Sequence, residues 1–281
     1  MSSRRLVLSA ALVALAVWLA GCATTPYQGE GKTKSDALLK HQFESAERLS
    51  PMKPGGRLIF AGFAMHSQSK AFRGDVSTAE KTVLSLDPEA IVFKLSNPAL
   101  GQEADWPYAT RENIDQVLKK MGDLAGPQDK VILLMSTHGS ADVLSINFGN
   151  QYYPHVNAKS LGESLTGLRG KPTLVVLSAC FSGSFLEPLR DANRVVLTAA
   201  AKNRSSFGCQ FQSTNTYFVD ALLNQPSLQD RSIVQLMEAA KIDVDSRERK
   251  QKLSPSMPQM FVGDSAKEWA NQAVKSWLTA P

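Results

Sequence analysis

Two apolar segments, each the length of a β-strand, constrain the fold of this 281-residue chain more than any other feature. They are residues 131–140 (VILLMSTHGS) and 173–185 (TLVVLSACFSGSF), and each ends in small residues and one reactive side chain, His138 or Cys180. A strand that is buried on both faces has a continuous apolar sequence rather than an alternating one. We therefore expect two neighbouring central strands of a parallel sheet, whose carboxyl ends open on the edge where α/β folds bind ligands.

Predicted strands and helices alternate along the rest of the chain, which favours an α/β fold with a mainly parallel sheet between layers of helices. Further strands are expected at residues 57–63, 90–95, 194–199 and, at an edge, within 254–263. Helices are expected around residues 114–122, 161–168, 214–223, 233–240 and 266–278. Ser77 with Glu80 has the form of a capping box, which predicts the start of another helix. Gly149 and Asn150 predict the turn of a small hairpin.

The N-terminus has the pattern of a secretion signal. Two arginines precede an apolar run of about fifteen residues, 6–20, which is short for a membrane span. The run ends in LAGC, residues 19–22, which resembles the lipobox of bacterial lipoproteins. That resemblance implies a signal peptide over residues 1–21, lipid attachment at Cys22, and, since Ala23 follows, sorting to the outer membrane facing the periplasm. An uncleaved anchor helix is the alternative.

Residues 22–54 are rich in Thr, Pro, Gly, Gln and Lys, with a short helical pattern inside, and predict a tether between the lipid and a domain at 55–281. The net charge of +5 falls to about +3 without Arg4 and Arg5. This weak, dispersed charge does not predict a nucleic-acid partner. The basic group at residues 247–252 is interpreted as a solvated helix face.

His138 and Cys180 together have the composition of a nucleophile with its acid/base partner. A free thiol is only a few per cent thiolate at neutral pH, so an active one needs a base, a positive neighbour or a helix N-terminus. His138 supplies the base, and a helix is expected to start within residues 185–189. The amides of Gly139 and Cys180 are candidates for an oxyanion hole. Taken singly, a buried cysteine or a lone histidine is more often structural; the pair at two strand ends favours catalysis.

Three sequence blocks resemble the bacterial members of the legumain-like C13 cysteine peptidases, within the caspase-like clan. The blocks are THG at 137–139, SACFSGSF at 178–185 and TAAAKNRSSFGC at 198–209, in the family's order and spacing. The resemblance implies a caspase-haemoglobinase fold, His138 and Cys180 as a catalytic dyad, protein or peptide substrates, and no metal or organic cofactor.

The resemblance is weaker at the specificity pocket. Arg73, Ser205 and Asp220 stand where pocket residues of legumains are expected to fall. Ser178 replaces an acidic residue of plant and animal legumains, and His66 stands in a loop that lacks their asparagine. These departures argue against asparagine specificity, and a solvated loop position is the favoured interpretation of His66.

Cys209 is the other cysteine of the predicted domain. An oxidising periplasm permits a disulfide with Cys180, but that bond would silence the nucleophile. A reduced Cys209, structural or beside the pocket, is therefore expected.

Three functions follow from these features. The leading one is a lipid-anchored cysteine endopeptidase of the cell envelope. The same dyad could act as a transpeptidase if an amine outcompetes water. An inactive binding or scaffolding module is the third, against which the intact His138 and Cys180 argue.

Overall fold

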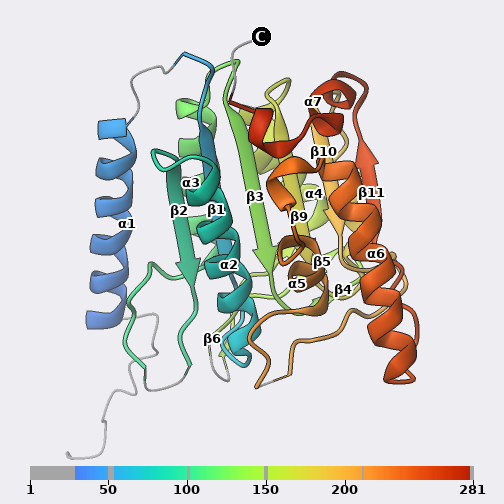
Figure 1. The fold of residues 1–281 in the computed structure, drawn as a ribbon. Coiled ribbons are helices and arrows are strands. Elements are labelled where there is room, and N and C mark those ends of the chain that lie inside the picture. Colours follow the sequence, from blue (N-terminus) through green and yellow to red (C-terminus); the bar gives the residue numbers. More distant parts are fainter. Residues whose placement is uncertain (1–28, 50–53, 100–101, 149–150, 211, 279–281) are drawn as a thin grey trace, which may run out of the picture.

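The computed structural model of the protein describes residues 29–49, 54–99, 102–148, 151–210 and 212–278 (Figure 1). The expected signal peptide and Cys22 lie outside these residues. In the described part of the chain, no helix is both long enough and apolar enough to cross a membrane.

A sheet of six strands forms the centre of the described structure, in the order β11-β10-β9-β3-β1-β2. The strands are β1 (Leu58–Ala64), β2 (Ile91–Ser96), β3 (Lys130–Ser136), β9 (Thr173–Ser178), β10 (Arg194–Thr198) and β11 (Gln259–Val262). All neighbours pair in parallel except β10 and β11, which are antiparallel. The two apolar segments are therefore adjacent central strands, β3 and β9, as the sequence predicted.

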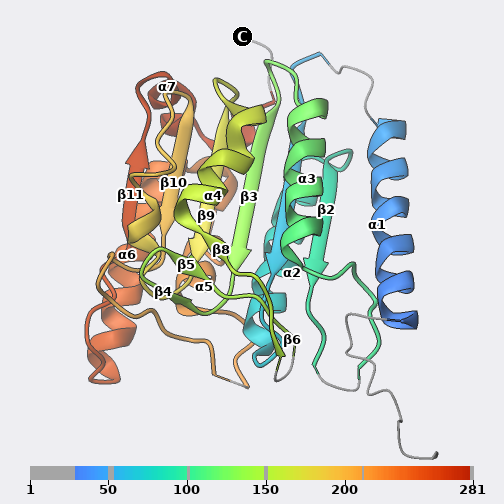
Figure 2. The same cartoon turned by 180° about the vertical axis from the view of Figure 1, so that it is seen from behind.

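Helices cover both faces of the sheet. One face carries α2 (Lys70–Leu86), α5 (Tyr217–Leu223), α6 (Ile233–Lys250) and α7 (Lys267–Asn271); the other carries α3 (Arg111–Leu124) and α4 (Ala158–Ser164) (Figures 1 and 2). Short 3-10 helices are η1 (Leu165–Leu168), η2 (Ser182–Phe185), η3 (Leu228–Asp230), η4 (Asp264–Ala266) and η5 (Val274–Ser276). The predicted α/β sandwich with a mainly parallel sheet is confirmed.

The two faces of the sheet have separate apolar cores because side chains alternate along each strand. On β3, Ile132 and Leu134 pack in the core beneath α2, α5 and α6, whereas Leu133 and Met135 pack in the core beneath α3 and α4. Ser136 and His138 continue the same two-residue spacing as Ile132 and Leu134. The alternation therefore directs His138 toward the α2 side of the sheet.

Helix α1 (Glu30–Leu49) belongs to the folded body rather than to a free tether. Its Leu39 and Ala46 are buried, and the Ser35 hydroxyl accepts a 2.8 Å hydrogen bond from the Tyr108 amide. The Phe43 ring packs edge-to-face against Phe93 of β2, with the ring centroids 5.8 Å apart. The domain boundary expected at residue 55 therefore moves to before Glu30, because the buried face of this helix covers the β2 edge of the sheet.

Three expected helix positions need correction. Helix α2 begins at Lys70 with Ser69 as its N-cap, so Ser77 lies inside the helix and not at its start. The segment after Cys180 forms the 3-10 helix η2, and no α-helix begins at residues 185–189. The terminal segment is divided among η4, α7 and η5, and α7 ends before η5 because the backbone is extended at Gln272.

Small strands follow β3 along the chain. β4 (Gly139–Ser140), β5 (Val143–Leu144) and β8 (Val156–Asn157) form one sheet, and β6 (Asn147–Phe148) with β7 (Gln151–Tyr152) forms the predicted hairpin. In both views these strands lie near the carboxyl ends of the main strands (Figures 1 and 2).

Candidate active site

The sheet register places His138 and Cys180 at equivalent positions beyond two adjacent strands. Ser136 of β3 is the Cα partner of Ser178 of β9, and each reactive residue follows its serine by two positions. The pairing continues past the strands, since the Thr137 amide donates to the Ser178 carbonyl at 3.1 Å. The two residues therefore follow the ends of adjacent strands at the same register.

Gly139 lies directly against the cysteine. A Cβ atom at this position would be 2.5 Å from the carbonyl oxygen of Cys180 and 3.1 Å from Cβ of Ala179. A side chain here would displace one of the two segments, which explains why a glycine follows the histidine.

The loop after β10 surrounds the Cys180 sulfur. The Ser206 amide donates to Sγ at 3.2 Å, and Sγ lies 3.5 Å from the Ser206 carbonyl oxygen. The Ser206 hydroxyl is 3.7 Å from Sγ. The neighbouring Phe181 has a φ of 58°, in the left-handed region, and its amide N–H donates to the Arg204 carbonyl oxygen at 2.7 Å. The sulfur therefore lies against both the N–H and the carbonyl oxygen of Ser206.

The His138 ring is half-buried between two other rings. The centroid of His66 is 4.6 Å away and that of Phe72 is 5.0 Å away, both nearly perpendicular to the His138 ring. Burial lowers the pKa of His138 below its ordinary value of 6.5. The ring is thus held in place without a carboxylate partner among the contacts of the described residues.

His66 occupies the third position of the same row. Ala64 of β1 pairs with Ser136 of β3, and His66 also follows its strand residue by two positions. Burial, with the nearby His138 and His155, lowers the pKa of His66 to about 4, so its ring is neutral at pH 7. The sequence favoured a solvated loop position for His66, but the half-buried ring contacts His138. The equal spacing from the strand ends was the signal that could have found it.

The three residues predicted for a specificity pocket lie around this edge but contact other groups. Arg73 donates through Nη1 to Asp105 at 2.7 Å and stacks over the Trp106 ring at 4.1 Å. Asp220 pairs with Arg247 at 2.6 Å. Ser205 is exposed and precedes Ser206, whose amide donates to the cysteine sulfur. The described contacts join none of the three to His138 or Cys180 directly.

Cys209 and Cys180 are both free thiols. Burial is the main cause that raises the pKa of Cys209, and the nearby Cys180 raises it further. The Cys209 thiol therefore stays protonated at neutral pH. Among the described residues, no group of three or more His, Cys, Asp or Glu side chains is arranged to hold a metal ion.

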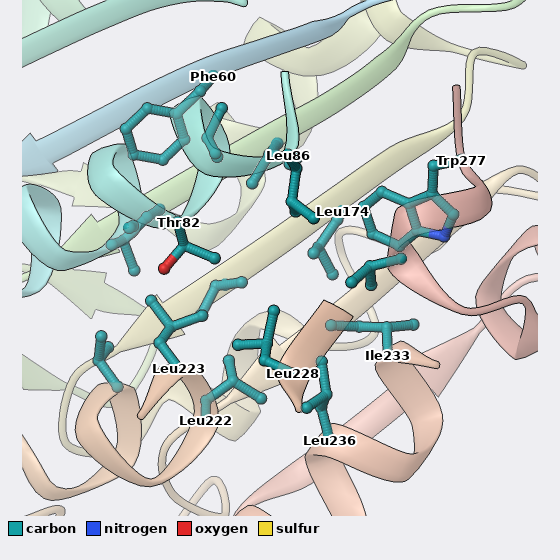
Figure 3. A pocket seen from close by; sticks show the side chains of 17 residues that line it. Phe60, Thr82, Leu86, Leu174, Leu222, Leu223, Leu228, Ile233, Leu236 and Trp277 are labelled. Carbon is teal, nitrogen blue, oxygen red and sulfur yellow. The ribbon is translucent and has the colours of Figure 1, made fainter. Parts of the chain in front are cut away.

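An apolar cavity of about 60 Å³ lies elsewhere, between the sheet and the helices of the α2 face. Figure 3 shows Leu174 of β9 at its floor, with Leu86, Leu222 and Trp277 around it. Neither His138 nor Cys180 lines this cavity. It is therefore an internal packing space and not the cleft in which a substrate would meet the thiol.

The architecture defines a caspase-like α/β fold. The crystal structure of caspase-1 from Spodoptera frugiperda aligns with a TM-score of 0.52 at 15% identity, covering 76% of this chain and 88% of that chain. The comparison with curated proteins gave no match. The family model described as the peptidase C13 family matches residues 112–268. The chain therefore belongs to the C13 family of legumain-like cysteine peptidases and is a cysteine-type peptidase acting on proteins or peptides.

Proposed function

We propose that His138 and Cys180 are the catalytic dyad of a cysteine endopeptidase. The observation that carries this proposal is the register: Ser136 pairs with Ser178, and both reactive residues follow by two positions on the α2 side of the sheet. The matched family region, residues 112–268, includes both.

The reaction follows from the groups around the sulfur. His138 takes the proton of Cys180, and the thiolate attacks the carbonyl carbon of the scissile bond. The Gly139 and Cys180 amides bind the oxyanion, and His138 then protonates the leaving amine; such acid help contributes about 10² to 10⁴ in rate. Water, deprotonated by His138, hydrolyses the thioester and restores the thiol. The Ser206 amide, 3.2 Å from Sγ, supports the proposal because it stabilises the charged sulfur.

The substrate pocket is proposed to lie on the Arg73 side of the dyad, with Ser205 and Asp220 as its further members. Phe72, whose ring contacts His138, immediately precedes Arg73 on α2. The guanidinium and the Asp105 carboxylate form an exposed pair of opposite charges near this edge. A polar residue on the substrate could replace one partner of that pair.

The same proposal places the enzyme in the bacterial envelope, with acyl chains on Cys22 holding it at the outer membrane on the periplasmic side. Several acyl chains on one residue anchor a protein firmly, whereas one chain holds it only marginally. Radiolabelled palmitate should enter the wild type and not the Cys22→Ala variant. Incorporation that survives the change refutes the anchor.

Cleavage of a peptide library tests the peptidase assignment. Wild-type protein and Cys209→Ala should cleave, and Cys180→Ala and His138→Ala should not. Mass spectra of the products, taken with and without an added amine, distinguish hydrolysis from transpeptidation. A reduced wild-type protein that cleaves nothing would favour a binding or scaffolding module.

A further inference from the structure

A fully buried carboxylate, Asp75 of α2, lies beneath the dyad and has no part in the mechanism described above. Its side chain is 0% exposed, and four donors point at it. Ser136 Oγ donates at 2.6 Å and Thr216 Oγ1 at 2.8 Å to one oxygen; the Thr216 amide at 2.9 Å and Asn215 Nδ2 at 3.3 Å donate to the other. An ionised carboxylate only accepts, so these four hydrogen bonds favour the charged form.

Thr216 extends the network from β3 to β9. Its hydroxyl gives its proton to Asp75 and lies 2.8 Å from the Ser178 hydroxyl, which must therefore donate. Thr216 is also the N-cap of α5. One carboxylate thus connects α2, the start of α5 and the carboxyl ends of two central strands.

The two serines in this network immediately precede the dyad. Ser136 and Ser178 are Cα partners, and His138 and Cys180 follow each by two residues. Small changes in the relative position of these two strand ends therefore move the imidazole relative to the sulfur.

The network does not maximise the stability of the fold. Burial raises the pKa of Asp75 to about 6 even though the hydrogen bonds lower it, so burial costs the charged form more than its four hydrogen bonds return. A well-packed apolar group at such a position is often at least as stabilising. A role in positioning the two strand ends accounts for a carboxylate at this place.

We propose that Asp75 is a positioning residue, whose carboxylate joins the ends of β3 and β9 through Ser136 and through Thr216 with Ser178, and so sets the separation of His138 and Cys180. This inference rests on the proposed dyad. Asp75 does not touch the reacting atoms, and its effect is exerted through the two serines.

The test is the rate of Cys180 alkylation by iodoacetamide as a function of pH, measured on the full-length protein and quantified on the Cys180 peptide by mass spectrometry. An imidazole beside a thiol extends thiolate reactivity to acid pH. Asp75→Asn keeps the shape and removes the charge. It should keep the wild-type thermal midpoint at pH 7.5 and lose about tenfold or more of the alkylation rate at pH 7, where the wild-type carboxyl is ionised, because misplacement by about 1 Å can reduce such rates a hundredfold.

Asp87→Asn is the matched control. Asp87 lies at the other end of α2, is 1% exposed and accepts from the Leu58 amide at 2.9 Å, at the amino end of β1. This variant should lower the thermal midpoint and leave the alkylation profile unchanged. Ser136→Ala and Ser178→Ala each remove one hydroxyl of the network and should cause a smaller loss of alkylation rate. These two variants test the proposal even if Asp75→Asn does not fold.

His138→Ala separates the two proposals. If it abolishes the acid branch of the profile while Asp75→Asn and both serine variants match the wild type, Asp75 has no positioning role and the dyad stands. If His138→Ala also matches the wild type, the dyad itself is wrong.

Discussion

The imidazole ring of His66 stands 4.6 Å from that of His138, at an interplanar angle of 89°. The two rings come from the ends of adjacent strands, β1 and β3, at the same distance past paired residues. The low pKa of His66, about 4, keeps it neutral, so it shields His138 from water without repelling a proton on it. His66 therefore influences the protonation of the proposed acid/base by burying it.

Replacing His66 by alanine should raise the pKa of His138 toward 6.5, because burial is what lowers it and the smaller side chain admits water. The measurement is an NMR titration of the ring protons in a Cys180→Ala background, where four histidines give resolvable signals. His41→Ala, on the exposed side of α1, is the control. An unchanged or lower pKa for His138 contradicts this account of its burial.

A methyl group at Gly139 should damage the candidate site. The added Cβ would be 2.5 Å from the Cys180 carbonyl, so backbone must shift, which typically costs about 1–3 kcal/mol of stability. Activity toward a cleaved peptide should fall at least tenfold, since the shift moves a proposed oxyanion donor. In Gly167→Ala the new Cβ makes an ordinary 3.6 Å contact, so that variant should retain activity. Equal activities in the two variants would be inconsistent with the close packing of Gly139.

The Ser206 amide should stabilise the reacting sulfur. Ser206→Pro removes the N–H that lies 3.2 Å from Sγ, and alkylation of Cys180 at neutral pH should slow by about tenfold, as expected for one hydrogen bond to a charged group. Ser206→Ala keeps the amide and loses only the hydroxyl, 3.7 Å away, so its rate should stay near wild type. The idea fails if a folded proline variant reacts as fast as the alanine variant.

The stability difference between Asp75→Asn and wild type should depend on pH. The pKa of Asp75 rises from 3.8 to about 6 on folding. The free energy of unfolding of the wild type therefore falls as pH rises from 3.8 to about 6, and the full loss is present above that pH. The asparagine variant should gain about 2 kcal/mol in unfolding free energy relative to wild type between pH 4 and pH 7. Urea titrations of both proteins at each pH measure this difference. Every other titratable group is present in both proteins, so its contribution cancels. A difference that stays constant with pH contradicts a buried, ionising Asp75.

The central part of the fold could be predicted from the sequence because its signals are local. Continuous apolar runs identify β3 and β9, and their abrupt ends locate His138 and Cys180. The predicted start of α2 was wrong. Ser69, the actual N-cap, precedes a polar lysine, whereas Ser77 and Glu80 have the spacing of a capping box but lie inside the helix.

The partners of the site could not be predicted in the same way. Asp75 and Thr216 are 141 residues apart and meet only when α2 and α5 pack on the same face. The helical pattern of α1 was visible, but the sequence does not say that its apolar side covers the edge of β2. Contacts of this kind depend on strand order, which no single segment encodes.

The most direct test of the proposed dyad is site-mapped labelling of the reduced protein with a peptidyl acyloxymethyl ketone at pH 7. The account predicts an adduct on Cys180, formed at least a hundredfold more slowly in His138→Ala and at the wild-type rate in Cys209→Ala. A label on Cys209, or a rate at Cys180 that does not depend on His138, would contradict it.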